Sequence, residues 1–211
     1  MKLNRLNAPV LFAAMILLLA AFPAHAEMML YDGIGLAAQV KFHGEGLYAD
    51  GKTVWAGQYR ITFQDAPYNA YCVDADQTSG SSEVTVAGLD VLRNGDLVGF
   101  LYETYADSVQ TGADAGALAV AIWEVLYETD DTFDAGEGYF HITNNSSVRN
   151  AANLLLETLP DAYDPNMKLA VLCSDRHQDM LIATAGEIPE PATLCLFMAG
   201  GVLASIRRSG V

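Results

Sequence analysis

The alternation of apolar and polar residues predicts strands at both ends of the central part of the chain. Residues 54–63 (V-W-A-G-Q-Y-R-I-T-F) alternate and are rich in β-branched and aromatic side chains, a pattern typical of a strand. A turn is expected at Asp65-Ala66-Pro67. Shorter apolar runs indicate four further strands, over residues 70–73, 83–86, 168–173 and 179–183.

Between these strands, apolar residues recur at the three- and four-residue spacing of helices. The spacing predicts three helices, over residues 98–105, 114–127 and 148–159. Ser146 or Ser147 is expected to cap the last helix, and both Trp55 and Trp123 are expected in the core. Strands on either side of a helical stretch indicate an α+β class, a single domain in which about three helices pack on a strand framework.

The N-terminal segment, residues 1–26, has the three parts of a secretory signal peptide. Lys2 and Arg5 form a basic start, residues 10–21 are apolar, and Ala24-His25-Ala26 is a small-x-small cleavage site. We therefore expect signal peptidase to cleave before Glu27 and the chain to be exported.

The C-terminal segment, residues 189–211, has the features of a second targeting signal. Pro189-Glu190-Pro191 precedes an apolar run over residues 192–206, and Arg207 and Arg208 follow it. As a helix, this run rises only about 22 Å, less than a hydrocarbon core of roughly 30 Å, so it predicts a short, weakly held transmembrane segment. The arginines are expected on the cytoplasmic side.

This arrangement resembles the PEP-CTERM sorting tail of exported bacterial proteins. The resemblance implies that an exosortase recognises and removes the tail. The chain is then expected to be anchored in the membrane transiently through its C-terminal hydrophobic helix. After removal of the tail, the chain is expected at the cell surface or in the extracellular matrix.

The remaining body, residues 27–188, is strongly acidic. It holds seven lysines and arginines against 25 aspartates and glutamates, a net charge of −18 with neutral histidines. Such a body repels nucleic-acid phosphates and anionic lipid, so nucleic-acid binding is excluded. About 160 residues suffice for one domain with a real core.

Short motifs in the body resemble the thioester domain of bacterial surface proteins over roughly residues 50–183. They are Tyr71-Cys72-Val73-Asp74 after the first long strand, Ala121-Ile122-Trp123-Glu124 within the second helix, and Gln178-Asp179. The resemblance implies a strand cysteine that attacks a helix glutamine, with loss of ammonia. The resulting internal thioester then acylates amines on a target surface.

The glutamine of that pair is missing here. The pattern Gln-x-Ala-Ile-Trp would place it at position 119, where this chain has Ala119. Alanine has no side-chain carbonyl, so Cys72 and Ala119 form a degenerate thioester site that cannot acylate. Gln110 lies upstream of the expected helix and would substitute only under a different alignment.

Two interpretations remain open for Cys72 and Cys173. Either they form a disulfide, which an exported compartment permits, or they are buried free thiols.

The sequence shows no pattern typical of a metal site. The acidic runs around Asp74 and Asp130 lack the positions of an EF-hand. Three histidines, His43, His141 and His177, are scattered, so neither a metal nor a cofactor is expected.

Together these features favour a non-enzymatic extracellular or cell-surface protein with a structural or adhesive role. Its expected partners are signal peptidase and exosortase during processing, and exopolysaccharide or other surface material afterwards. Two alternatives remain open at this point. One is a reactive thioester adhesin that bonds to surface amines, and the other is a secreted carbohydrate-binding protein.

Overall fold

The computed structural model describes residues 26–129 and 132–184, which belong to one compact unit. The expected signal peptide up to residue 25 and the whole expected sorting tail, including Pro189-Glu190-Pro191 and Arg207-Arg208, lie outside the described residues. Among the residues that are described, no helix combines the length and apolar character needed to span a bilayer.

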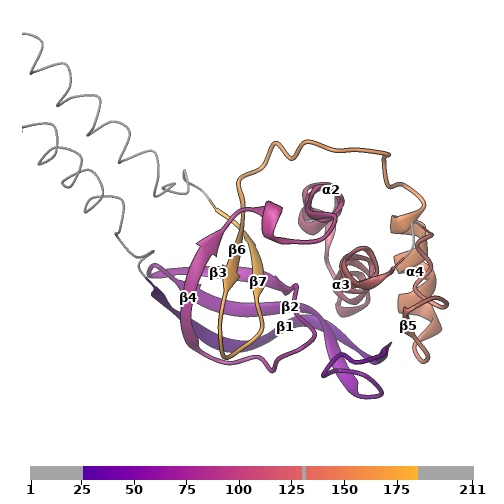
Figure 1. Ribbon diagram of the computed structural model, residues 1–211, viewed down its shortest axis with the longest axis horizontal. Coiled ribbons are helices and arrows are strands. Elements are labelled where there is room, and N and C mark those ends of the chain that lie inside the picture. Colours follow the sequence, from indigo (N-terminus) through magenta and orange to yellow (C-terminus); the bar gives the residue numbers. More distant parts are fainter. Residues whose placement is uncertain (1–25, 130–131, 185–211) are drawn as a thin grey trace, which may run out of the picture. The chain divides into compact units, whose positions relative to one another are not determined.

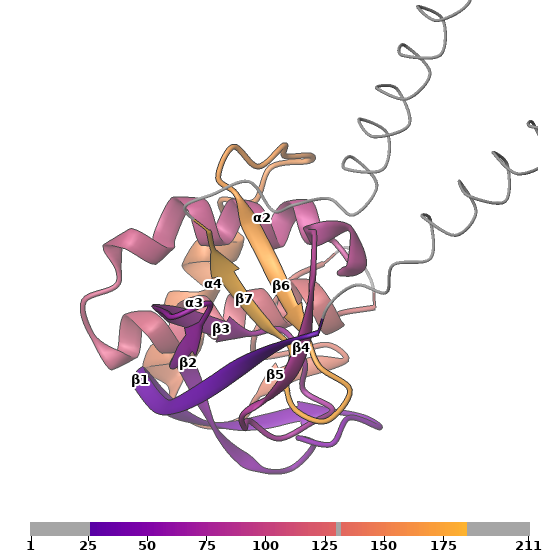
Figure 2. The ribbon, with the colours of Figure 1, turned by 90° about the vertical axis from the view of Figure 1, so that its left-hand side faces the viewer.

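In the described part of the chain, seven antiparallel strands form the framework (Figure 1). They are β1 (Glu27–Gly44), β2 (Thr53–Phe63), β3 (Ala66–Cys72), β4 (Ser82–Ala87), β5 (Phe140–Ile142), β6 (Leu169–Cys173) and β7 (Met180–Ala183). Their order is β2-β3-β7-β6-β4-β1-β5, and β1 also pairs with β2, so the pairings close into a ring. In the turned view, β7, β6 and β4 lie next to one another (Figure 2).

The long strand β1 closes this ring because it has three partners. Residues 27–29 pair with β4, residues 29–41 pair with β2, and residues 42–44 pair with β5. The register with β2 shifts between Tyr31 and Gly33, where Gly33 has φ +115°, and again between Ile34 and Ala37. Bulges of this kind bend a strand and increase its twist, which lets one strand serve several neighbours.

Helix α3 (Gly112–Tyr127) is the centre of the core. It contacts β1 and β2 on one side and α2 (Gly95–Tyr105) and α4 (Ser146–Leu156) on the other, and every residue from Ala115 to Leu126 is buried. Short 3₁₀ turns, Leu89–Val91 and Ala106–Ser108, flank α2.

Glycine lets α3 lie close to the strands. A Cβ added at Gly116 would meet the Cβ of Ala38 at 2.9 Å, and one added at Gly112 would meet the Ala37 carbonyl oxygen at 2.4 Å. The small residues on one face of α3 are therefore packing residues. The helix itself begins with a capping box between Thr111 and Asp114, which satisfies its first backbone N–H groups.

The α+β class and the three helices predicted from the sequence are confirmed. Two details differ. Asn145, rather than Ser146 or Ser147, caps α4 by accepting a hydrogen bond from the Val148 N–H. The turn before β3 consists of Gln64 and Asp65, both with positive φ, while residues 66 and 67 already pair with β2.

The two tryptophans, both expected in the core, lie in different environments. Trp123 is 3% exposed, as expected, and its ring packs edge-on against Phe42 at 5.6 Å between centroids. Trp55 is 41% exposed, so the expectation for it was wrong. Trp55 lies near the start of β2, where residues 53 and 55 are exposed and the buried run begins at Ala56.

Candidate functional site

The end of β3 contacts α3 at Cys72, the cysteine of the Tyr-Cys-Val-Asp motif. Cys72 is the last residue of the strand and is 1% exposed. The indole N–H of Trp123 donates a hydrogen bond of 2.9 Å to the Cys72 carbonyl oxygen. We call this contact between β3 and α3 the Cys72–Trp123 junction. It links the two segments that carry the Tyr-Cys-Val-Asp and Ala-Ile-Trp motifs.

Burial makes the Cys72 thiol a poor nucleophile. Removal from water raises its pKa to about 12, because the interior penalises the charged thiolate. The S–H group is directed to the Asp74 carbonyl oxygen, with a sulfur–oxygen distance of 3.0 Å. Since the thiolate is the reactive form of cysteine, this thiol is protonated and unreactive at neutral pH.

Ala119 lies on the same face of α3 as Trp123, one turn closer to the N-terminus of the helix. It is 1% exposed. This is the helix position that the motif alignment assigns to the missing glutamine. Its methyl group fills buried space and offers no group that a thiol could attack.

Gln110 occupies a different region. It precedes α3, and its backbone N–H donates to the Asp114 carboxylate at 3.2 Å. Twelve residues of helical rise separate the Thr111 cap from Trp123, a distance of about 18 Å along the axis. The Gln110 backbone therefore lies a long way from the Cys72–Trp123 junction.

Other motif residues gather around the same junction. The Tyr127 hydroxyl, one turn after Trp123, accepts the Ala75 N–H at 2.6 Å. The Val73 N–H donates to the Asp179 carbonyl oxygen at 3.0 Å, so the Gln178-Asp179 segment is held beside the end of β3. Burial raises the pKa of both the Asp74 and the Asp179 carboxyl groups. Three motifs far apart in sequence thus meet at one place.

Cys72 and Cys173 are both free thiols, so the disulfide interpretation does not hold in this structure. Cys72 and Leu172 each pair with Met180 of β7, on its two sides, which places them two strands, or about 10 Å, apart. Cys173 follows Leu172 and projects from the other face of β6. Bridged cysteines need Cα atoms within about 7 Å.

Acidic side chains do not gather for a metal in the part of the chain that is described. No group of three or more His, Cys, Asp or Glu side chains there is arranged to hold one. The Asp74 carboxylate accepts the Asp76 N–H, and the Asp134 carboxylate accepts from Gly136 and from the Asn153 side chain. Asp130 and Asp131 lie outside the described residues.

Sequence spacing missed one pair of chemistry-bearing residues. Strands β1 and β5 pair so that His43 lies directly opposite His141, although 98 positions separate them. The three-residue strand β5 has too little alternation to be recognised, and β1 is interrupted by bulges. A reliable strand register would have been needed to find the pair.

The described residues form an α+β protein in which the buried Cys72 contacts the central helix α3 through Trp123. No protein-family model, curated protein or solved structure matches this chain.

Proposed function

We propose that this chain is an exported bacterial protein with a thioester-like domain that has lost its reactive bond and acts structurally or adhesively. Signal peptidase and an exosortase process it, and the body works at the cell surface or in the extracellular matrix. The observation that carries the proposal is the Cys72–Trp123 junction, with Ala119 one turn away on the same helix face.

Two observations at the junction support a thioester-domain-like arrangement. The Trp123 indole reaches the carbonyl group of the strand-end Cys72, and Ala119 lies four residues before Trp123 on the same face of α3, with both Cys72 and Ala119 buried. Exclusion of water would protect a thioester from hydrolysis. A domain with this architecture but without the glutamine retains the fold and cannot form the internal thioester.

In this proposal the junction stabilises the fold and forms no covalent bond. The hydrogen bonds of Trp123 to Cys72 and of Tyr127 to Ala75 fasten the end of β3 to the central helix. With the thiol protonated and buried, attachment to other material is non-covalent. The net charge of −18 on residues 27–188 favours solubility and cationic or neutral partners over anionic ones.

The chemical half of the proposal is tested by intact mass and by methylamine. The wild-type protein should have the mass of its sequence, without loss of ammonia, and should form no methylamine adduct. The variant Ala119→Gln supplies the missing carbonyl group, and the same variant combined with Cys72→Ser lacks the sulfur. Ammonia loss in the first variant alone would show that only the glutamine was missing, and no loss in either would show that burial of the thiol also prevents the reaction. A methylamine adduct on a glutamine of the wild-type protein would contradict the proposal and favour a reactive adhesin.

The sorting half is tested by deleting residues 189–211 in a host that contains an exosortase. The truncated chain should appear in the medium or periplasm without a membrane-anchored intermediate, whereas the full chain should pass through one. The matched control replaces Pro189-Glu190-Pro191 with alanines and keeps the apolar run. Identical fractionation of truncated and full-length chains would refute the role of the tail.

A further inference from the structure

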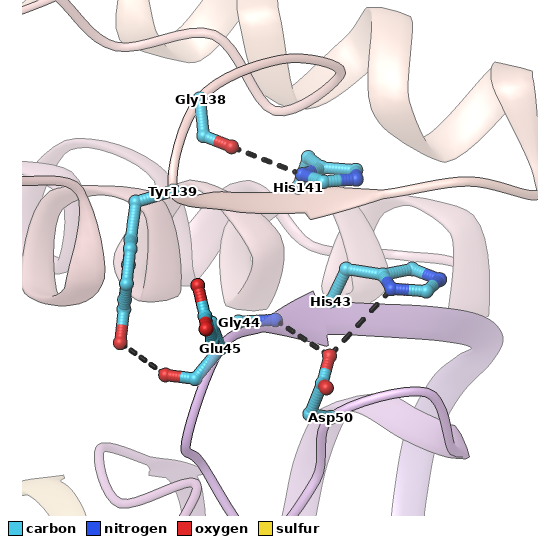
Figure 3. A network of polar contacts seen from close by, with 7 residues as sticks. All are labelled: His43, Gly44, Glu45, Asp50, Gly138, Tyr139 and His141. Atoms are coloured by element: carbon cyan, nitrogen blue, oxygen red, sulfur yellow. Dashed lines mark hydrogen bonds and ion pairs between the residues drawn. The ribbon is translucent and has the colours of Figure 1, made fainter.

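Two histidines from distant parts of the sequence form a stacked pair on the β1–β5 ribbon. His43 and His141 are directly opposite each other in the strand register. Their ring centroids are 5.2 Å apart and the ring planes differ by 9°. Figure 3 shows both rings extending to the same side of the ribbon. We call them the histidine pair.

The neighbours of the pair fix which nitrogen of each ring carries the proton. His141 Nδ1 lies 3.2 Å from the Gly138 carbonyl oxygen, and a carbonyl can only accept, so Nδ1 is the protonated nitrogen. His43 Nδ1 lies 3.6 Å from the Asp50 carboxylate, which favours a proton on that nitrogen too. With the ring proton on Nδ1, the lone pair that can bind a metal is on Nε2.

We infer that His43 and His141 bind one divalent transition-metal ion through their two Nε2 atoms, with water completing the coordination. In Figure 3, the second nitrogen of each ring points away from Asp50 and Gly138 and to the same side. A histidine whose Nδ1–H is directed to a carboxylate or a backbone carbonyl is the usual arrangement for metal ligation through Nε2.

Binding requires a small movement of the rings. Metal–imidazole bonds of about 2.0–2.1 Å hold two neighbouring nitrogens roughly 3 Å apart, so the parallel rings must tilt toward each other. The His43 side chain is 32% exposed and His141 is half-buried, so rotation about their side-chain bonds leaves the core undisturbed.

The surroundings already hold the backbone of both histidines. Asp50 accepts the Gly44 N–H at 3.1 Å, next to His43. Two residues before His141, the Tyr139 N–H donates to the buried Glu128 carboxylate at 2.8 Å, and the Tyr139 hydroxyl donates to the Glu45 carbonyl oxygen. These contacts hold β1 and β5 together, so the backbone around both histidines is already ordered before the ion binds.

Imidazole ligands favour zinc, copper and nickel over calcium and magnesium, which prefer oxygen ligands. The acidic body raises the local concentration of cations near its surface. The ligand class is thus a borderline transition-metal dication, and Zn²⁺ is the suitable probe because it does not oxidise the free thiols of the chain.

The test is a calorimetric titration of the purified full-length chain with ZnCl₂. Wild-type protein should bind one ion at a site that His43→Ala and His141→Ala each weaken at least tenfold, as loss of one of two protein ligands demands. The matched control is His177→Ala. His177 Nδ1 likewise faces a carbonyl oxygen, that of Thr78 at 3.1 Å, but the described residues place no second imidazole beside it.

Melting curves without zinc show whether the variants are folded, and Zn²⁺ should raise the melting temperature of wild type and His177→Ala only. Unchanged zinc affinity in both His43→Ala and His141→Ala would overturn the inference. So would displacement of Zn²⁺ by an equal concentration of Ca²⁺, because an oxygen-ligand site elsewhere would then account for the binding.

Discussion

The Cys72–Trp123 junction and the histidine pair both contain side chains capable of chemistry, but only the pair is open to solvent. Cys72 is 1% exposed, and burial raises its pKa to about 12. The side chain of His43 is 32% exposed, and its ring lies beside a carboxylate. Residue type alone therefore does not identify a reactive centre. Access to solvent and the neighbouring groups decide whether a thiol or an imidazole can act.

The two regions nevertheless depend on the same helix. Trp123 of α3 donates to the Cys72 carbonyl, and Glu128, the residue that follows α3, accepts the Tyr139 N–H beside β5. One helix thus fixes a hydrophobic junction and, at its C-terminal end, the backbone next to the histidine pair. Variants along α3 can separate the two functions by their effects on stability and on zinc affinity.

The largest effect is expected at the junction, from Trp123→Ala. This change removes a buried ring and the hydrogen bond to Cys72, and it should lower the free energy of unfolding by about 3–5 kcal/mol. The matched control is Trp55→Ala, at a side chain that is 41% exposed, which should cost less than about 1 kcal/mol. Urea denaturation measures both, and equal losses would show that Trp123 does not anchor the core.

The sequence predicted the helix of the junction but not the histidine pair, for a physical reason. The helix containing Trp123 has a clear apolar spacing, which predicts both the helix and the burial of its tryptophan. The pair depends on the register between β1 and β5, which is set by bulges and by tertiary packing. Local alternation carries no information on that register, so His43 and His141 appeared scattered.

The second effect concerns Glu128, which supports the ribbon that bears the histidine pair. Glu128 is 1% exposed, and its carboxylate accepts N–H bonds from Thr129 at 2.7 Å and Tyr139 at 2.8 Å. Glu128→Gln turns an amide N–H₂ toward one of these donors. It should lower the free energy of unfolding by about 1–3 kcal/mol and weaken zinc binding as well.

The control for this variant is Glu137→Gln, in the same loop and at an exposed position. It should change stability by less than about 0.5 kcal/mol. Urea denaturation and zinc titration give the two readouts. If Glu128→Gln were as stable as wild type, the buried carboxylate would not hold the backbone beside Tyr139.

The smallest effect is a pH dependence at Asp74 and Asp179, next to the junction. Burial raises the pKa of both carboxyl groups in the folded state, and a neighbouring negative charge adds to this effect, from Asp76 at Asp74 and from Asp74 at Asp179. A raised folded pKa means that the folded protein binds more protons than the unfolded chain. This contribution is fully present below the unfolded carboxyl pKa of about 3.9 and is lost as the pH rises through the raised value.

Asp74→Asn should therefore be more stable than wild type at pH 7, and the difference should vanish near pH 3, where the wild-type carboxyl is neutral. The asparagine oxygen can still accept the Asp76 N–H. Because the carboxyl is partly exposed to water, the gain should stay below about 1 kcal/mol. Asp65→Asn, at an exposed turn, is the control and should show no such trend. Melting curves from pH 3 to 7 measure the difference, and a gain that did not depend on pH would mean that charge at Asp74 does not destabilise the junction.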